Sequence, residues 1–100
     1  MTLFREALRL LEVEAGFLAR GTRALAEMRQ GGELLELIFD ATTSPFKYGL
    51  ELLGRLLTAS DELSSDEQLE TVALARKLQA DYPDIPKILE VTSGIIAKHG

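Results

Sequence analysis

The densest set of side chains that could bind a cation is the acidic run 61–67. Hard cations such as Ca²⁺ prefer carboxylate oxygens, so the run is a candidate metal site. It lacks the alternating oxygen ligands, central glycine and terminal glutamate of a calcium-binding EF-hand loop. Ser64 and Glu67 instead have the spacing of a capping box, which opens a helix. We therefore interpret the run as a solvated loop followed by helix N-terminal acids, and predict no metal site.

Side chains suited to imidazole or thiol chemistry are scarce. The chain has no cysteine and a single histidine, His99, next to its last residue. A catalytic imidazole must be held by rigid surroundings, whereas chain ends usually fray. We expect His99 to cap or pack against a helix end. Gly31 and Gly32 are not followed by the Lys-Ser/Thr of a phosphate-binding loop, and are interpreted as a helix stop. The sequence predicts no catalytic residues, no cofactor and no enzymatic activity.

Glu14 is the carboxylate with the most unusual position, because it falls at the edge of the apolar face of a predicted helix. Burial would raise the pKa of this carboxyl group and suit it to acid–base work. The commoner alternative is that the side chain pairs with an arginine or reaches solvent, and we favour that alternative.

A small basic cluster, Arg20, Arg23 and Arg29, lies toward the end of the first predicted helix. It could contact RNA or another anion, or it could compensate the helix dipole. No aromatic residues are interleaved with these arginines, and a net charge of −5 disfavours phosphate backbones. We predict no nucleic-acid partner.

Composition indicates one soluble domain over residues 1–100. The chain is 46% hydrophobic and 27% charged, both ordinary values for a globular protein. Its apolar runs are far shorter than the ~20 residues that span a bilayer, and its start does not resemble a secretion signal. We expect a cytoplasmic protein with no membrane insertion.

The first element that must position these groups is a long amphipathic helix. Apolar residues recur at three- and four-residue steps from Leu3 to Met28, with Thr2 as a candidate N-cap. Gly16 and Gly21 weaken this helix locally, and Gln30-Gly31-Gly32 ends it. Part of the apolar face has the spacing of a coiled-coil seam: Phe4, Leu8, Leu11, Ala15, Leu18, Thr22 and Leu25.

Shorter helices are predicted for the rest of the chain. The block 33–41 is very apolar, and an early glutamate favours helix over strand. Ser44-Pro45 has the pattern of an N-cap followed by proline at the first helical position, so we expect a new helix there. A further helix opens at the capping box of Ser64. The segment Ile85–Lys98 has helical spacing, although its β-branched residues and Ser93-Gly94 leave a hairpin as the alternative.

These patterns predict an all-α bundle of about five helices. Several segments, notably 33–41 and 45–57, are apolar around more than half of their circumference, which places them at the centre of the bundle or at an interface. We therefore expect a non-enzymatic protein-interaction or adaptor module that self-associates, or a helical carrier that binds an apolar small molecule or acyl chain. The candidate interface residues are Phe4, Leu8, Leu11, Leu18, Leu25, Phe39, Tyr48 and Leu52.

Overall fold

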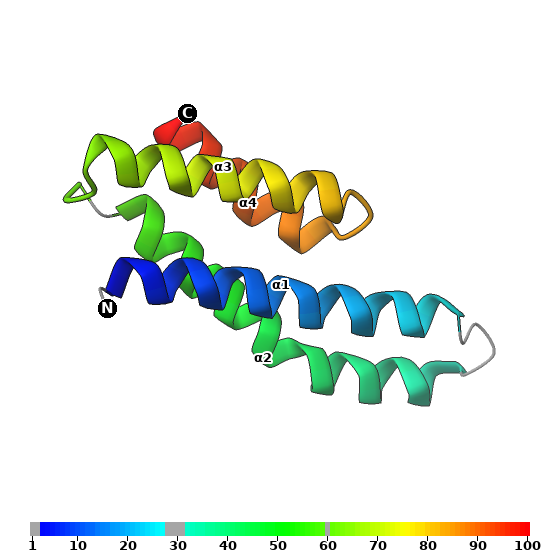
Figure 1. Cartoon of the computed structure of the whole chain (residues 1–100). Helices are drawn as coiled ribbons and strands as arrows, with labels where there is room; N and C mark the ends of the chain where they lie inside the picture. Colours follow the sequence, from blue (N-terminus) through cyan, green and yellow to red (C-terminus); the bar gives the residue numbers. More distant parts are fainter. Residues whose placement is uncertain (1–2, 28–31, 60) are drawn as a thin grey trace.

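Four helices make up the described part of the chain, which comprises residues 3–27, 32–59 and 61–100 of a computed structural model (Figure 1). They are α1 (Leu3–Glu27), α2 (Gly32–Ala59), α3 (Ser65–Asp81) and α4 (Pro86–His99). No strand occurs among these residues. The predicted all-α bundle is therefore confirmed, with four helices instead of about five.

Helix α1 is the long N-terminal helix expected from the sequence, and it continues through Gly16 and Gly21. At Gly21 it approaches α2 closely, because a Cβ atom there would lie 3.3 Å from both Phe39 and Thr43. The candidate N-cap Thr2, the apolar residue Met28 and residues 30–31 of the predicted helix stop lie outside the described residues. One face of α1 is buried: Ala7, Leu11, Ala15, Leu18 and Ala19.

The predicted helix boundary at Ser44-Pro45 is wrong, because α2 runs through it without a break. Ser44 does not cap a new helix. Its hydroxyl donates to the carbonyl of Asp40 at 2.6 Å, and the hydroxyls of Thr42 and Thr43 likewise donate to carbonyls four residues earlier, at 2.8 and 2.9 Å. Such back-bonding keeps hydroxyl residues inside a helix and often bends it.

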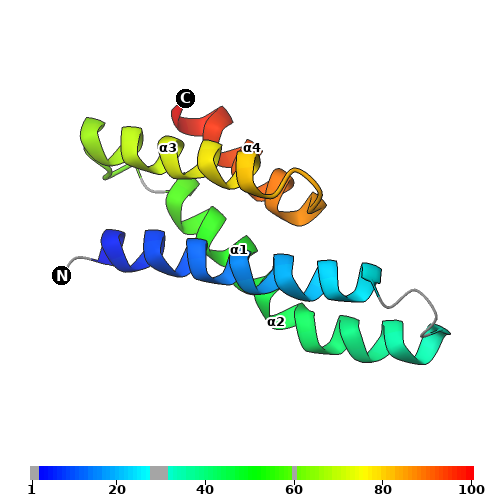
Figure 2. The same cartoon turned by 45° about the vertical axis from the view of Figure 1, so that its right-hand side comes forward.

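Pro45 adds to this bend, since it has no N–H for the carbonyl four residues earlier and its ring crowds that carbonyl. Helix α2 accordingly changes direction about midway along its length (Figures 1 and 2). Its first half runs beside α1, and its second half passes behind α1 toward α4. One bent helix therefore replaces the two short helices predicted for this region.

The last two helices begin where the sequence places them. The capping box of α3 is confirmed: the Ser64 hydroxyl accepts from the Glu67 amide at 3.1 Å, and the Glu67 carboxylate accepts from the Ser64 amide at 2.9 Å. The segment predicted as helix or hairpin over Ile85–Lys98 is helix, with Pro86 in its first turn.

Helices α1 and α2 form one hairpin, and α3 and α4 form a second that packs across it (Figure 2). Helix α3 contacts α1, and α4 contacts the second half of α2. The first hairpin extends beyond the second at the end where α2 begins, giving a molecule of 48 × 22 × 20 Å. The shared core contains Leu11, Leu18, Leu50, Leu57, Leu78, Ile85, Ile88 and Ile95.

Candidate interaction surface

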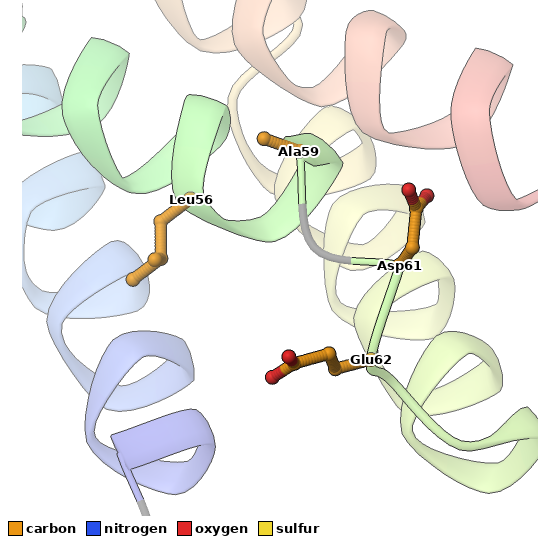
Figure 3. A pocket seen from close by; sticks show the side chains of 4 residues that line it. All are labelled: Leu56, Ala59, Asp61 and Glu62. Carbon is orange, nitrogen blue, oxygen red and sulfur yellow. The ribbon is translucent and has the colours of Figure 1, made fainter.

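Acidic residues of the run 61–67 contact different partners in the structure. Asp61 lies 3.5 Å from the ammonium group of Lys98, and Glu67 completes the capping box. Asp61 and Glu62 border a hollow of about 410 Å³ below the end of α2, and their side chains point in different directions (Figure 3). Among the described residues there is no group of three or more acidic or histidine side chains placed to hold a metal ion.

His99 forms a contact between the end of α4 and the end of α2. Its Nε2 atom lies 2.6 Å from the carbonyl oxygen of Leu57, so the protonated Nε2 donates to that oxygen. Leu57 is in the last turn of α2, where carbonyl groups have no partner within the helix. His99 therefore caps a helix end as predicted, although the helix is α2 and the partner is 42 residues away.

Glu14 is partly buried between α1 and α2, as its place at the edge of the apolar face suggests. Its Oε2 atom is buried and has no hydrogen-bond partner among the described residues. Burial raises the pKa of the Glu14 carboxyl group above its usual value of 4.5. The favoured prediction for Glu14 is an arginine partner or contact with solvent, but Oε2 has neither an arginine partner among the described residues nor access to solvent.

The basic cluster of α1 is engaged within the chain. Arg23 donates two hydrogen bonds to the Asp84 carboxylate, at 2.8 and 3.0 Å, and its guanidinium lies over the Tyr82 ring. Arg20 lies over the Phe17 ring, 4.8 Å from its centroid. Arg29 is outside the described residues. The two described arginines thus have local partners on the surface of α1 and the α3–α4 turn.

The predicted interface residues are separated by the fold. Leu11 and Leu18 are fully buried in the core, so the seam predicted on α1 packs against this chain's own helices. Four others are partly buried: Phe4 and Leu8 pack against the core, and Leu25 and Phe39 lie between α1 and α2. Only Tyr48 and Leu52 are exposed, on the side of α2 that faces away from α1.

Tyr48 and Leu52 belong to a larger set of exposed apolar residues along α2. With 3.6 residues per turn, the set falls in a strip roughly 100° wide, opposite the residues that α2 buries. Leu34 is 70% exposed, Leu37 66% and Tyr48 62%. We call this strip the outer face of α2, and it comprises Leu34, Leu37, Ile38, Ala41, Pro45, Tyr48, Leu52 and Leu56.

Sequence reasoning found two of these eight residues. The signal for the others is present, because leucines and other apolar residues recur at three- and four-residue steps from Leu34 to Leu56. It was hidden by the predicted boundary at Pro45, which divided one continuous strip into two short segments. The excess of apolar residues in both segments is explained by a helix that is apolar on two opposite faces.

Charges beside the outer face change sign along α2. The second half carries Arg55, which is exposed, and Glu51, which is matched by Lys87 of α4 at 2.5 Å. That ion pair holds the pKa of Glu51 below its usual value. The half near the start of α2 therefore carries negative charge, and Arg55 adds positive charge near the end. The exposed charged residues of the first half are all acidic: Glu33, Glu36 and Asp40.

An apolar groove lies beside the outer face, between the second half of α1 and the first half of α2. Its volume is about 350 Å³, within the usual range for small-molecule sites. Polar groups are scarce there, because the Thr42 and Thr43 hydroxyls donate to backbone carbonyls. The residues that line it are Phe17, Gly21, Ala24, Leu25, Ile38, Phe39, Thr42, Thr43 and Phe46.

Comparisons of the chain with family models, with curated proteins and with solved structures give no match. None of the described helices is long and apolar enough to cross a membrane.

Proposed function

We propose that this chain is a small, non-enzymatic protein-interaction module that acts by binding another protein surface to the outer face of α2. The observation that carries the proposal is the continuous exposure of this face. From Leu34 to Leu56 the strip is about 33 Å long at 1.5 Å per residue. Taken as about one helix width across, it covers roughly 330 Å², the size of the largest apolar patch on a typical monomer.

The position of the outer face also supports an interaction role. Helix α2 already buries Leu50 and Leu57 in the core on its opposite side. The fold therefore does not require apolar residues on the outer face. Leaving several leucines in water is unfavourable by about 1 kcal/mol or more for each side chain that a partner would cover. A second helix laid along the strip would recover that free energy.

Site-specific photocrosslinking tests this proposal in the protein's native cells. A photoreactive phenylalanine analogue replaces Tyr48 on the outer face, and in a matched control it replaces Leu69, which is 68% exposed on α3. We expect covalent adducts with a defined protein from position 48 and none from position 69. Introducing Leu37→Glu into the protein labelled at position 48 should abolish these adducts. Equal labelling at both positions, or no adduct from position 48 of the folded protein, would contradict the proposal.

The groove between α1 and α2 favours a second candidate function, a carrier of an apolar small molecule or acyl chain. Its lining is apolar and its volume suits such a ligand. This alternative predicts a small molecule that stays with the protein through purification and is released on denaturation, where mass spectrometry would detect it. Ala24→Phe, at an exposed residue of the groove lining, would fill the groove and should abolish the retention.

A further inference from the structure

We propose that the outer face of α2 binds the same face of a second copy of this chain, with the two α2 helices antiparallel and crossing near Pro45. The inference rests on the proposed function and names its partner. A two-fold axis through the middle of α2 generates this arrangement, and such a contact must be complementary to itself.

The apolar residues of the outer face meet that requirement. In an antiparallel pair centred between Ser44 and Pro45, residues equally far from the centre face each other. Ala41 then lies opposite Tyr48 of the second copy, so the smallest side chain of the strip faces its largest. Leu37 likewise lies opposite Leu52 of the second copy, and Leu34 lies within one residue of the position opposite Leu56.

The charges beside the strip favour the same antiparallel orientation. Centring the pair on this position brings Glu33 of one copy to within one residue of the level of Arg55 of the other, at both ends of the strip. The acidic first half of each α2 then lies along the half of its partner that carries Arg55. A parallel pair would instead place the three acids of each first half at the same level, where they repel.

The size of the outer face indicates a weak contact between the two copies. The strip covers roughly 330 Å², less than the roughly 800 Å² that each partner buries in a standard interface, so we expect the copies to associate only at high concentration. Because the proline bend makes the outer face convex, the helices are closest near Pro45, and the pairs nearest to it, Ala41 with Tyr48, contribute most of the contact.

The first test is the mass of the purified protein in solution, measured by light scattering from micromolar to millimolar concentration. We expect it to approach twice the chain mass of 11.0 kDa. Leu37→Glu should weaken the association by roughly tenfold or more, and Leu69→Glu on α3 should leave it unchanged. Circular dichroism would verify that both variants remain helical.

Engineered cysteines test the orientation, because the natural chain has none. We expect Ala41→Cys mixed with Tyr48→Cys to form a disulfide-linked heterodimer under mild oxidation. Neither variant alone should crosslink, since its own cysteines would be separated by about two helical turns. Self-crosslinking of each single variant would indicate a parallel pair and overturn the proposal.

The charge contribution is tested by exchange. Arg55→Glu should weaken the dimer, and Glu33→Arg introduced in the same chain should restore it.

The results that would overturn this inference differ from those that would overturn the proposed function. A monomer at every concentration, together with photocrosslinking of position 48 to a different protein, would overturn the second copy and leave the interaction module standing. A dimer that is unaffected by Leu37→Glu would also overturn the second copy at this face, whereas the absence of any adduct from position 48 would overturn both proposals.

Discussion

The carboxylate of Glu14 occupies the space that a side chain at Gly49 would fill. Because glycine has no Cβ atom, the Glu14 side chain reaches across from α1 to the backbone of α2. One of its oxygens is buried there without a hydrogen-bond partner among the described residues. The loss of hydration disfavours the charged form and raises the pKa of this carboxyl group. The contact therefore costs stability whenever Glu14 is ionised.

Replacement of this carboxylate should stabilise the protein in a pH-dependent way. We expect Glu14→Gln to raise the free energy of unfolding at neutral pH by about 1 kcal/mol, because burying a neutral amide costs less hydration free energy than burying a carboxylate. Above its usual pKa of 4.5, Glu14 loses its proton more readily in the unfolded chain than in the folded one. Rising pH therefore destabilises the wild type through this window, up to the raised pKa. The advantage of Glu14→Gln should shrink as the pH falls toward 4.5.

Urea denaturation at neutral and acidic pH measures this difference. Glu6, Glu51 and Asp84 have lowered pKa values, because their ion pairs favour the charged form. Their stabilisation is lost as the pH falls, equally in wild type and variant, so it cancels in the comparison. Glu36→Gln, at an exposed site on the same hairpin, is the matched control. A pH-independent difference for Glu14→Gln would show that the charge of Glu14 is not what destabilises the fold.

Two glycines of α2 should respond in opposite ways to alanine. Gly49→Ala displaces only the flexible end of Glu14, so the gain in helix propensity, about 1 kcal/mol, should be retained. A Cβ atom at Gly54 would lie 2.8 Å from Cγ1 of Val91, a branched side chain close to the α4 backbone. Gly54→Ala must therefore push α4 away from α2, and we expect a net loss of about 1–3 kcal/mol.

Gly94→Ala is the control for propensity alone, because a Cβ atom at this position in α4 would meet no atom within 4 Å. Thermal or urea denaturation should show that Gly94→Ala and Gly49→Ala are more stable than the wild type. The Gly54→Ala variant should be less stable than the wild type. A stable Gly54→Ala protein would mean that α4 is not tightly packed against α2 at Val91.

The helices of this chain could be predicted from local patterns, whereas the interaction surface could not. The capping box joins Ser64 to Glu67 three residues away, and the apolar period of α1 is equally local. The Ser44-Pro45 boundary failed because the Ser44 hydroxyl can bond forward as an N-cap or backward to Asp40. Packing decides between them, since the neighbouring Thr43 is buried at the close approach to Gly21.

The outer face of α2 was missed for a related reason. A helix that is apolar on two sides has an excess of leucines in its sequence. The excess does not indicate which of the two faces is buried in the core. That choice depends on contacts with α1 and α4, such as the pairing of Lys87 with Glu51. The partner of His99 was equally hidden, because Leu57 is distant in the sequence and contributes only its backbone carbonyl.

Loss of the His99 contact should loosen the end of α2. We expect His99→Ala to lower the free energy of unfolding by about 1 kcal/mol, because the Leu57 carbonyl loses its donor. Lys98→Ala is the control, since its 3.5 Å contact with Asp61 is exposed and should contribute less than about 0.5 kcal/mol. Urea denaturation would compare the two. An effect of His99→Ala no larger than that of Lys98→Ala would mean that the α2 terminus does not need this cap.

Restoring an amide at the bend of α2 should stabilise the monomer. Pro45→Ala provides an N–H for the Ala41 carbonyl and removes the proline ring, and we expect a gain of about 1–3 kcal/mol. Ser44→Ala is the control, because it removes the hydroxyl bond to Asp40 and leaves the proline bend in place. Its effect should be within about 0.5 kcal/mol at this exposed site. If Pro45→Ala instead destabilises the protein, the bend is required for α2 to pack on α1 with its first half and on α4 with its second.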